Sequence, residues 1–155
     1  MKKATLCYII KNGKILLIKK KRGLGAGKYN GPGGKVEDGE DVFDSITREV
    51  EEELGIIPLN LELVGKIVFY WDDGEHDQTV FVFVSDNFEG KLISTDEAEP
   101  EWFPIDNIPF DKMWDDDKFW MPLMLKGRKF SGVFRFSSDH KLKDYILEET
   151  NVIEL

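Results

Sequence analysis

The alternation of apolar and polar residues predicts a chain made mainly of strands. Residues 5–10 and 14–20 follow the two-residue period of half-buried strands, and Asn12-Gly13 between them is a pair typical of hairpin turns. The same pattern predicts four later strands, at residues 62–71, 78–86, 129–137 and 142–148. The last of these stays open, because residues 141–149 could equally form a helix.

Two segments follow a helical period instead. The first has an apolar stripe formed by Val42, Phe43, Ile46, Val50 and Leu54. Asp41, with Asp44 three residues later, resembles a capping box, and Gly55 is a typical helix stop, so we predict a helix over residues 42–54. A second helix is predicted over residues 116–125. We expect the stripe to pack on a sheet and the polar side to lie at the rim of the core.

The polar side of the first predicted helix carries four glutamates within the run Arg48–Glu53. Glu49, Glu52 and Glu53 are three and four residues apart, so they project from one side of the helix and repel one another. A divalent cation removes that repulsion, and clustered carboxylates suit a hard ion such as Mg²⁺ or Mn²⁺. The alternative is a solvated acidic face, which is common on helices.

Just before this helix, residues 30–34 read Asn-Gly-Pro-Gly-Gly. So much glycine predicts a loop without regular structure, in which the backbone can approach a ligand closely. This loop, next to the acidic cluster, favours a metal and ligand site over a merely solvated helix face.

The spacing of these residues resembles the Nudix hydrolase box at each defined position, namely Gly34, Glu40, Arg48-Glu49-Val50, Glu52-Glu53 and Gly55-Ile56. The resemblance implies an α/β/α sandwich with a central mixed sheet and two main helices, in one domain over residues 1–155. It also implies hydrolysis of a nucleoside diphosphate linked to another group. Arg48 then orients the carboxylates. The implied metal ligands are Glu49, Glu52, Glu53 and the carbonyl of Gly33, with Glu97 serving the metal or the attacking water.

Residues 19–31, 113–122 and 126–136 are further similar to the MutT-type oxidised purine nucleoside triphosphate hydrolases within this family. This resemblance implies that the nucleotide is bound by Thr5, Lys20, Asn30, Gly33, Gly34, Lys35, Phe69, Trp114, Asp116 and Asp117. The residue types suit the task, because a flat purine needs an aromatic face and hydrogen-bonding groups at its edge. The alternatives are a core tryptophan at position 114 and helix-capping aspartates at 115–117.

Charge and cysteine content narrow the range of partners. The formal net charge of -9 argues against nucleic acid as the main partner, whereas the basic run Lys19–Arg22 can meet phosphate oxygens. No apolar run approaches the ~20 residues needed to span a bilayer, so no membrane partner is expected. Cys7 is the only cysteine, which excludes an intramolecular disulfide and makes the cytoplasm the default location. We expect a monomer that binds a small-molecule purine nucleoside triphosphate.

The resemblance therefore implies an enzyme that uses Mg²⁺, or Mn²⁺, to hydrolyse oxidised purine (deoxy)nucleoside triphosphates such as 8-oxo-dGTP to monophosphate and pyrophosphate. The expected catalytic residues are Arg48, Glu49, Glu52, Glu53 and Glu97. Two alternatives stay open: a Nudix hydrolase for another nucleotide, such as ADP-ribose or a dinucleoside polyphosphate, and a nucleotide-sensing module without turnover. The complete set of box carboxylates disfavours the sensing module.

Overall fold

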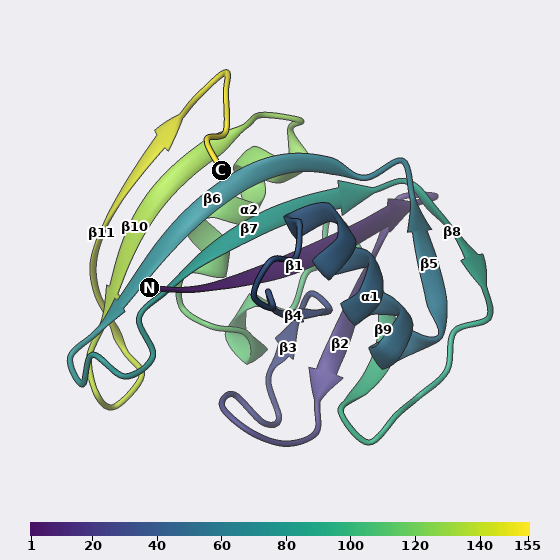
Figure 1. Ribbon diagram of the computed structural model, residues 1–155, viewed down its shortest axis with the longest axis horizontal. Coiled ribbons are helices and arrows are strands. Elements are labelled where there is room, and N and C mark those ends of the chain that lie inside the picture. Colours follow the sequence, from purple (N-terminus) through teal and green to yellow (C-terminus); the bar gives the residue numbers. More distant parts are fainter.

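A long mixed sheet forms the middle of the protein (Figure 1). The computed structural model describes residues 1–155. In chain order its elements are β1 (Lys2–Lys11), β2 (Lys14–Lys20), β3 (Tyr29–Asn30), β4 (Gly33–Lys35), α1 (Val42–Leu54), β5 (Ile56–Leu59), β6 (Glu62–Trp71), β7 (Gln78–Ser85), β8 (Asn87–Gly90), β9 (Ala98–Pro104), a 3-10 helix η1 (Phe110–Lys112), α2 (Asp117–Leu125), β10 (Phe130–Phe136) and β11 (Leu142–Glu149).

The sheet runs in the order β11-β10-β6-β7-β1-β2-β3, with β4 paired to β1 and β9 paired to β2. Two pairs are parallel, β1 with β7 and β6 with β10, and the other pairs are antiparallel. β1 pairs with β7, β2 and β4, and it is in register with β7 from Lys2 opposite Gln78 to Ile9 opposite Ser85. Strands β5 and β8 form a separate antiparallel pair.

One helix covers each face of the sheet. In Figure 1, α1 lies in front of the sheet and α2 behind it. Alternate residues of β1 divide the core, since Cys7 and Ile9 pack with the buried face of α1, whereas Tyr8 packs with Trp120 and Met121 of α2. The prediction of an α/β/α sandwich with a mixed sheet and two main helices is confirmed.

The predicted helix over residues 42–54 is confirmed at both ends. The carboxylate of Asp41 accepts a hydrogen bond from the backbone N–H of Phe43 at 2.7 Å, and Gly55 is the C-cap. The capping box is only half right, because Asp44 returns no hydrogen bond to the N-cap. Phe43 was placed in the apolar stripe, but its side chain lies at the edge of the core and is 38% exposed.

Other boundaries need correction. The segment 30–34 is not free of regular structure, because Asn30 pairs with Ile18 in β2 and Gly33–Lys35 pairs with β1. The ambiguous C-terminal segment is a strand rather than a helix, and α2 starts at Asp117, one residue later than predicted. Strands β5, β8 and β9 were missed, since each is short or weakly patterned and forms through its partner strand.

No helix in the structure is long and apolar enough to cross a membrane.

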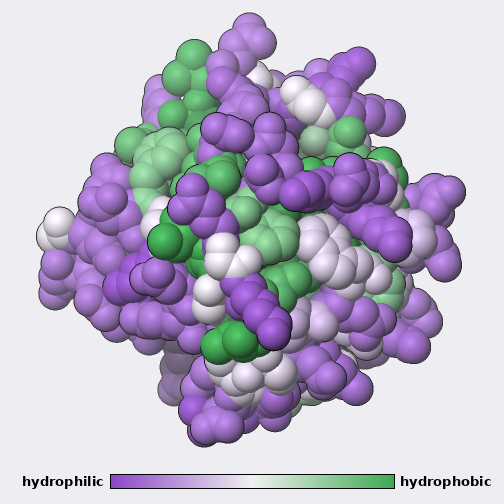
Figure 2. Space-filling model, turned by 90° about the vertical axis from the view of Figure 1, so that its right-hand side faces the viewer, coloured by the Kyte–Doolittle hydropathy of each residue, from purple (hydrophilic) through white to green (hydrophobic).

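The end of the molecule that carries β5 and β8 shows apolar groups in the middle, framed by hydrophilic side chains (Figure 2).

Candidate functional site

A cavity of about 330 Å³ gathers residues from segments far apart in the sequence. Its walls come from β1, the 20–35 region, the last turn of α1, β6, β7, β10 and the start of α2. Each predicted nucleotide-binding residue lines this cavity, as do Glu53 and Glu97, whereas Arg48, Glu49 and Glu52 lie outside its lining. We call the part around Gly33, Glu53 and Glu97 the α1 end, and the part around Asn30, Trp114, Asp116 and Asp117 the α2 end.

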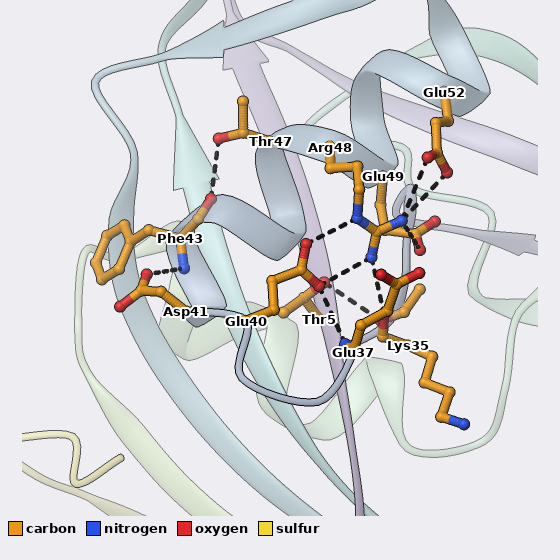
Figure 3. Close-up of polar contacts among 11 residues, drawn as sticks. Thr5, Lys35, Glu37, Glu40, Asp41, Phe43, Thr47, Arg48, Glu49 and Glu52 are labelled. Atoms are coloured by element: carbon orange, nitrogen blue, oxygen red, sulfur yellow. Dashed lines mark hydrogen bonds and ion pairs between the residues drawn. The ribbon is translucent and has the colours of Figure 1, made fainter.

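Next to the α1 end, the guanidinium of Arg48 ties the acidic helix to the preceding loop (Figure 3). It donates to Glu40 from Nε at 2.8 Å, to Glu49 at 2.9 Å and to the carbonyl of Lys35 at 3.1 Å. A longer contact of 3.2 Å reaches Glu52, whose side chain is 59% exposed. The hydrogen bond from Arg48 lowers the pKa of Glu40 to about 2. Arg48 therefore orients these carboxylates, as the sequence predicts, and leaves Glu53 free.

Glu53 is the most perturbed carboxyl at the α1 end. Burial raises its pKa to about 8, and the negative charges of Glu49 and Glu97 add to the rise. A hydrogen bond with the backbone of Gly33 and the charge of Lys20 oppose it only in part. The pKa of Glu49 is also raised by burial. A positive charge placed between these carboxylates would relieve both burial and repulsion.

Two glycines let the helix and the β1–β4 pair come this close. A Cβ atom at Gly33 would overlap the carbonyl oxygen of Thr5, and one at Gly34 would overlap the carboxylate of Glu49. Thr5 adds a side-chain hydrogen bond to the carbonyl of Gly34 at 3.3 Å. Only glycine fits at these positions. Because neither residue has a side chain and both line the cavity, a ligand can approach their backbone directly.

The five predicted metal ligands do not converge on one point, and no group of three acidic, histidine or cysteine side chains is arranged to hold an ion. Glu49 and Glu52 are engaged by Arg48, and Glu97 is paired with Arg22 across the cavity rim. The Arg22 pair also lowers the pKa of Glu97. The donor chemistry nevertheless fits a hard divalent cation, because Glu53 is a half-buried carboxyl without a basic hydrogen-bond partner and feels the negative charges of Glu49 and Glu97.

At the α2 end, two adjacent aspartates are almost completely buried, Asp116 with 3% and Asp117 with 2% of its surface exposed. Trp120 donates its indole N–H to Asp116 Oδ2 at 2.8 Å, which favours an ionised Asp116. Burial raises the pKa of Asp116 to about 6, and burial together with the charge of Asp116 raises that of Asp117 well above its usual value. Both shifts oppose ionising the two groups together, and the larger rise at Asp117 favours that residue as the protonated one.

The hydrogen bonds of Asn30 fix the direction of its amide. Its Oδ1 accepts from the hydroxyl of buried Tyr8 at 3.1 Å and from the backbone N–H of Gly31 at 2.9 Å. With the oxygen saturated, the free group is the amide NH₂. Asn30 therefore offers donors to a ligand. Asp117 Oδ2, which is buried without a hydrogen-bond partner, offers a donor or an acceptor depending on its proton.

Trp114 forms an aromatic wall above this polar end. Its ring meets Trp71 edge-on at 5.5 Å between centroids, and the ammonium of Lys28 lies 5.3 Å from its centre. Residue 25 must be glycine here, since a Cβ would press on the Trp114 indole. Trp114 is only partly buried, in contrast to Trp120. The core-tryptophan alternative therefore describes Trp120 rather than Trp114, and the capping alternative for Asp116 is wrong, because its side chain makes no cap hydrogen bond.

Sequence reasoning missed several residues of the cavity. Five lysines line it, none of them in an ion pair, and only Lys20 and Lys35 were predicted; the others are Lys2, Lys3 and Lys28. Trp71, Val80 and Phe136 were also missed, whereas Leu24 and Gln78 stand where the family resemblance already implies pocket residues. For Lys2, Lys3, Trp71, Val80 and Phe136 the signal in the sequence is their place on strands, whereas Lys28 lies in the loop before β3 and has no such signal. These lysines explain how a protein of net charge -9 presents a locally basic cavity.

Comparisons with known proteins agree with this geometry. The family model described as NUDIX domain matches residues 1–124. The chain is 42% identical over 145 residues to the oxidized purine nucleoside triphosphate hydrolase of Danio rerio, covering 94% of this chain and 93% of that protein. The protein of the same name from Mus musculus is 39% identical over 147 residues, covering 95% and 94%. The crystal structure of a mutator MutT protein from Bacillus halodurans matches with a TM-score of 0.86 and 29% identity, covering 96% of this chain and 98% of that one.

Proposed function

Because the chain belongs to the NUDIX domain family, we propose that it is a metal-dependent hydrolase that converts oxidised purine (deoxy)nucleoside triphosphates, such as 8-oxo-dGTP, to monophosphate and pyrophosphate. The relatives from Danio rerio and Mus musculus, which match over nearly the whole chain, support the substrate class. The observation that carries the proposal is one cavity with two different ends, a basic and acidic α1 end and a dry, proton-holding α2 end. In the cell this reaction removes damaged nucleotides before polymerases use them.

The α1 end suits a polyphosphate and its metal. NUDIX hydrolases generally need a divalent metal, and here we propose Mg²⁺, or Mn²⁺, held by Glu53 with Glu49, Glu52, Glu97 and the Gly33 carbonyl. Such an ion supplies charge neutralisation at the phosphates and a water of lowered pKa. Lys20 and Lys35 meet phosphate oxygens, and Arg48 holds Glu49 and Glu52 in place. Catalysis here consists mainly of positioning and electrostatics.

The α2 end suits an oxidised purine base. Trp114 supplies a flat aromatic face, Asn30 supplies fixed donors, and the Asp116 and Asp117 pair supplies one donor and several acceptors. Moving the shared proton between Asp116 and Asp117 changes the pattern that the pocket presents. One pocket can therefore accept both oxidised guanine and oxidised adenine bases.

Product analysis tests the reaction. Purified protein with 8-oxo-dGTP and Mg²⁺ should release the monophosphate and pyrophosphate in equal amounts, and a chelator should stop the release. Release of inorganic phosphate with the diphosphate as co-product would show cleavage at a different bond and overturn the proposed reaction. Tight binding of 8-oxo-dGTP without any turnover in Mg²⁺ or Mn²⁺ would support the sensing module instead.

A further inference from the structure

A partly buried glutamine faces the same cavity without any partner in the protein. Gln78 is the first residue of β7 and lies opposite Phe69 in β6 and Lys2 in β1. Its side chain lies on the face shared with Val80, which lines the cavity as well. The amide of Gln78 makes no hydrogen bond, although it carries two donor hydrogens and an acceptor oxygen.

The other strand of this hairpin, β6, also carries a polar group without a hydrogen-bond partner at the cavity. Trp71 ends β6, lines the cavity and has a buried indole N–H without a hydrogen-bond partner. Buried polar groups are nearly always paired in folded proteins, so the unpaired indole N–H of Trp71, together with the partly exposed amide of Gln78 that also lines the cavity, indicates a polar ligand nearby. The cavity therefore has a second polar edge that is separate from Asn30, Asp116 and Asp117.

The two polar edges come from different strands of the sheet. Gln78 is on β7 and Asn30 is on β3, with β1 and β2 between them in the sheet, and both residues line the cavity. The aspartates are buried and Gln78 is partly exposed, so Gln78 lies nearer the mouth. When the Watson–Crick edge of a purine forms hydrogen bonds with Asn30, Asp116 and Asp117, the opposite, imidazole edge of the purine points away from these three residues.

We propose that Gln78 reads the oxidised imidazole edge of the purine and so separates 8-oxopurines from ordinary purines. This inference rests on the proposed function. An 8-oxopurine presents an N7–H donor beside a C8=O acceptor, which matches the carbonyl and NH₂ of a primary amide in two hydrogen bonds. An ordinary purine presents only an N7 acceptor beside a C8–H, so it can form one such bond. Gln78 is then a specificity-determining residue in direct contact with the base.

The test compares substrates that differ only in where they are oxidised. Gln78→Met keeps the side-chain length and removes both polar groups. For this variant we expect kcat/KM to fall about tenfold for 8-oxo-dGTP and 8-oxo-dATP. For 2-oxo-dATP, which is oxidised on the other edge, and for dGTP it should change less than about threefold. Thr79→Val is the matched control, because Thr79 is the next residue of β7 but lies outside the cavity lining.

A second readout does not depend on turnover. Without metal, the variant should bind 8-oxo-dGMP about tenfold more weakly than the unchanged protein does, and dGMP about equally well. Equal losses for all nucleotides, or no loss for the 8-oxopurines, would overturn the role of Gln78. Either result leaves the proposed function intact as long as the unchanged protein hydrolyses 8-oxo-dGTP. The proposed function fails separately if the unchanged protein does not hydrolyse it.

Discussion

At and next to the α1 end of the cavity, arginines hold Glu49, Glu52 and Glu97, whereas at the α2 end Asp116 and Asp117 are buried without a basic partner. The α1 side chains come mostly from neighbouring turns of one helix. Those of the α2 end depend on partners from β1, β3 and α2. An exposed, arginine-paired cluster can rearrange around metal and phosphate, but a dry and packed pair cannot. We therefore expect the α1 end to set the rate for every substrate and the α2 end to set the choice among them.

The largest effect should come from Glu53→Gln, which keeps the side-chain volume and removes the buried charge. We expect kcat to fall by at least ~10²-fold at saturating Mg²⁺, by the same factor for 8-oxo-dGTP and 2-oxo-dATP. Steady-state pyrophosphate release measures it. Glu51→Gln is the control, since Glu51 lies on the exposed side of the same turn and outside the cavity. If kcat fell by different factors for the two substrates, the α1 end would also affect the choice of base, which contradicts the separate roles of the two ends.

Asp117→Asn should have the next largest effect and should act on selectivity. The change fixes one member of the pair as a neutral group, so the proton can no longer move between Asp116 and Asp117. The ratio of kcat/KM for oxidised guanine and oxidised adenine triphosphates should change by roughly ten- to a hundredfold. Asp111→Asn serves as control, because Asp111 is exposed in η1 and lies outside the cavity lining. A constant ratio at all pH values would remove the pair from base recognition.

Lys20→Met should weaken binding of the phosphates without affecting the choice of base. Lys20 lies close enough to Glu53 and Glu97 to lower both pKa values, so it also lies where a polyphosphate would pass. We expect KM to rise about tenfold for every nucleoside triphosphate, since a charged contact of this kind is worth roughly 1.5–3 kcal/mol. Lys19→Met, on the exposed face of β2, is the comparison. A rise in KM for the nucleotides of one base only would show that Lys20 contacts the base rather than the phosphates.

A smaller effect concerns stability against pH. The pKa values of Asp116 and Asp117 are raised above those of the unfolded chain, so the folded protein holds extra protons from about pH 4 upward. The free energy of unfolding should therefore fall as the pH rises from 4 through 6 and beyond. Asp117→Asn should lose part of this slope. With a chelator present, the Tm of the variant at pH 8 should exceed that of the unchanged protein by at least about 2–4 °C, which corresponds to ~1 kcal/mol in a chain of this size. The difference in Tm should disappear near pH 4. A difference in Tm that stays the same at all pH values would exclude the titration of Asp116 and Asp117 as its cause.

The same contrast explains what the sequence can reveal. Helix α1 follows local rules, namely a cap at Asp41, a stripe of apolar residues and a stop at Gly55, so the helix can be predicted from its own residues, and the spacing of its glutamates places them on one side of it. The α2-end residues were found through a family resemblance rather than from physical pattern. The pairing of Arg22 with Glu97 and the orientation of Asn30 by Tyr8 were not predictable, because they depend on strands that meet only in the fold.

Short strands set a similar limit. β4 is three residues long and mostly glycine, so no propensity in its own sequence marks it, and its hydrogen bonds come from β1. Trp71 looks like an ordinary strand residue in the sequence, and Gln78 is marked only by the family resemblance. Their place at the cavity follows from the pairing of β7 with β1 and of β6 with β7. Prediction from sequence therefore succeeds where contacts are local and fails where distant strands supply them.

Relative kcat/KM across a nucleotide panel with Mg²⁺ tests the central proposal most directly. The panel should contain 8-oxo-dGTP, 2-oxo-dATP, dGTP, ADP-ribose and a dinucleoside polyphosphate, each assayed at the same protein and metal concentrations. We expect both oxidised triphosphates to exceed ADP-ribose and the dinucleoside polyphosphate by at least about a hundredfold, since two lost polar contacts at a buried base are worth that much. Faster hydrolysis of ADP-ribose or of the dinucleoside polyphosphate would show that the α2 end does not read an oxidised purine.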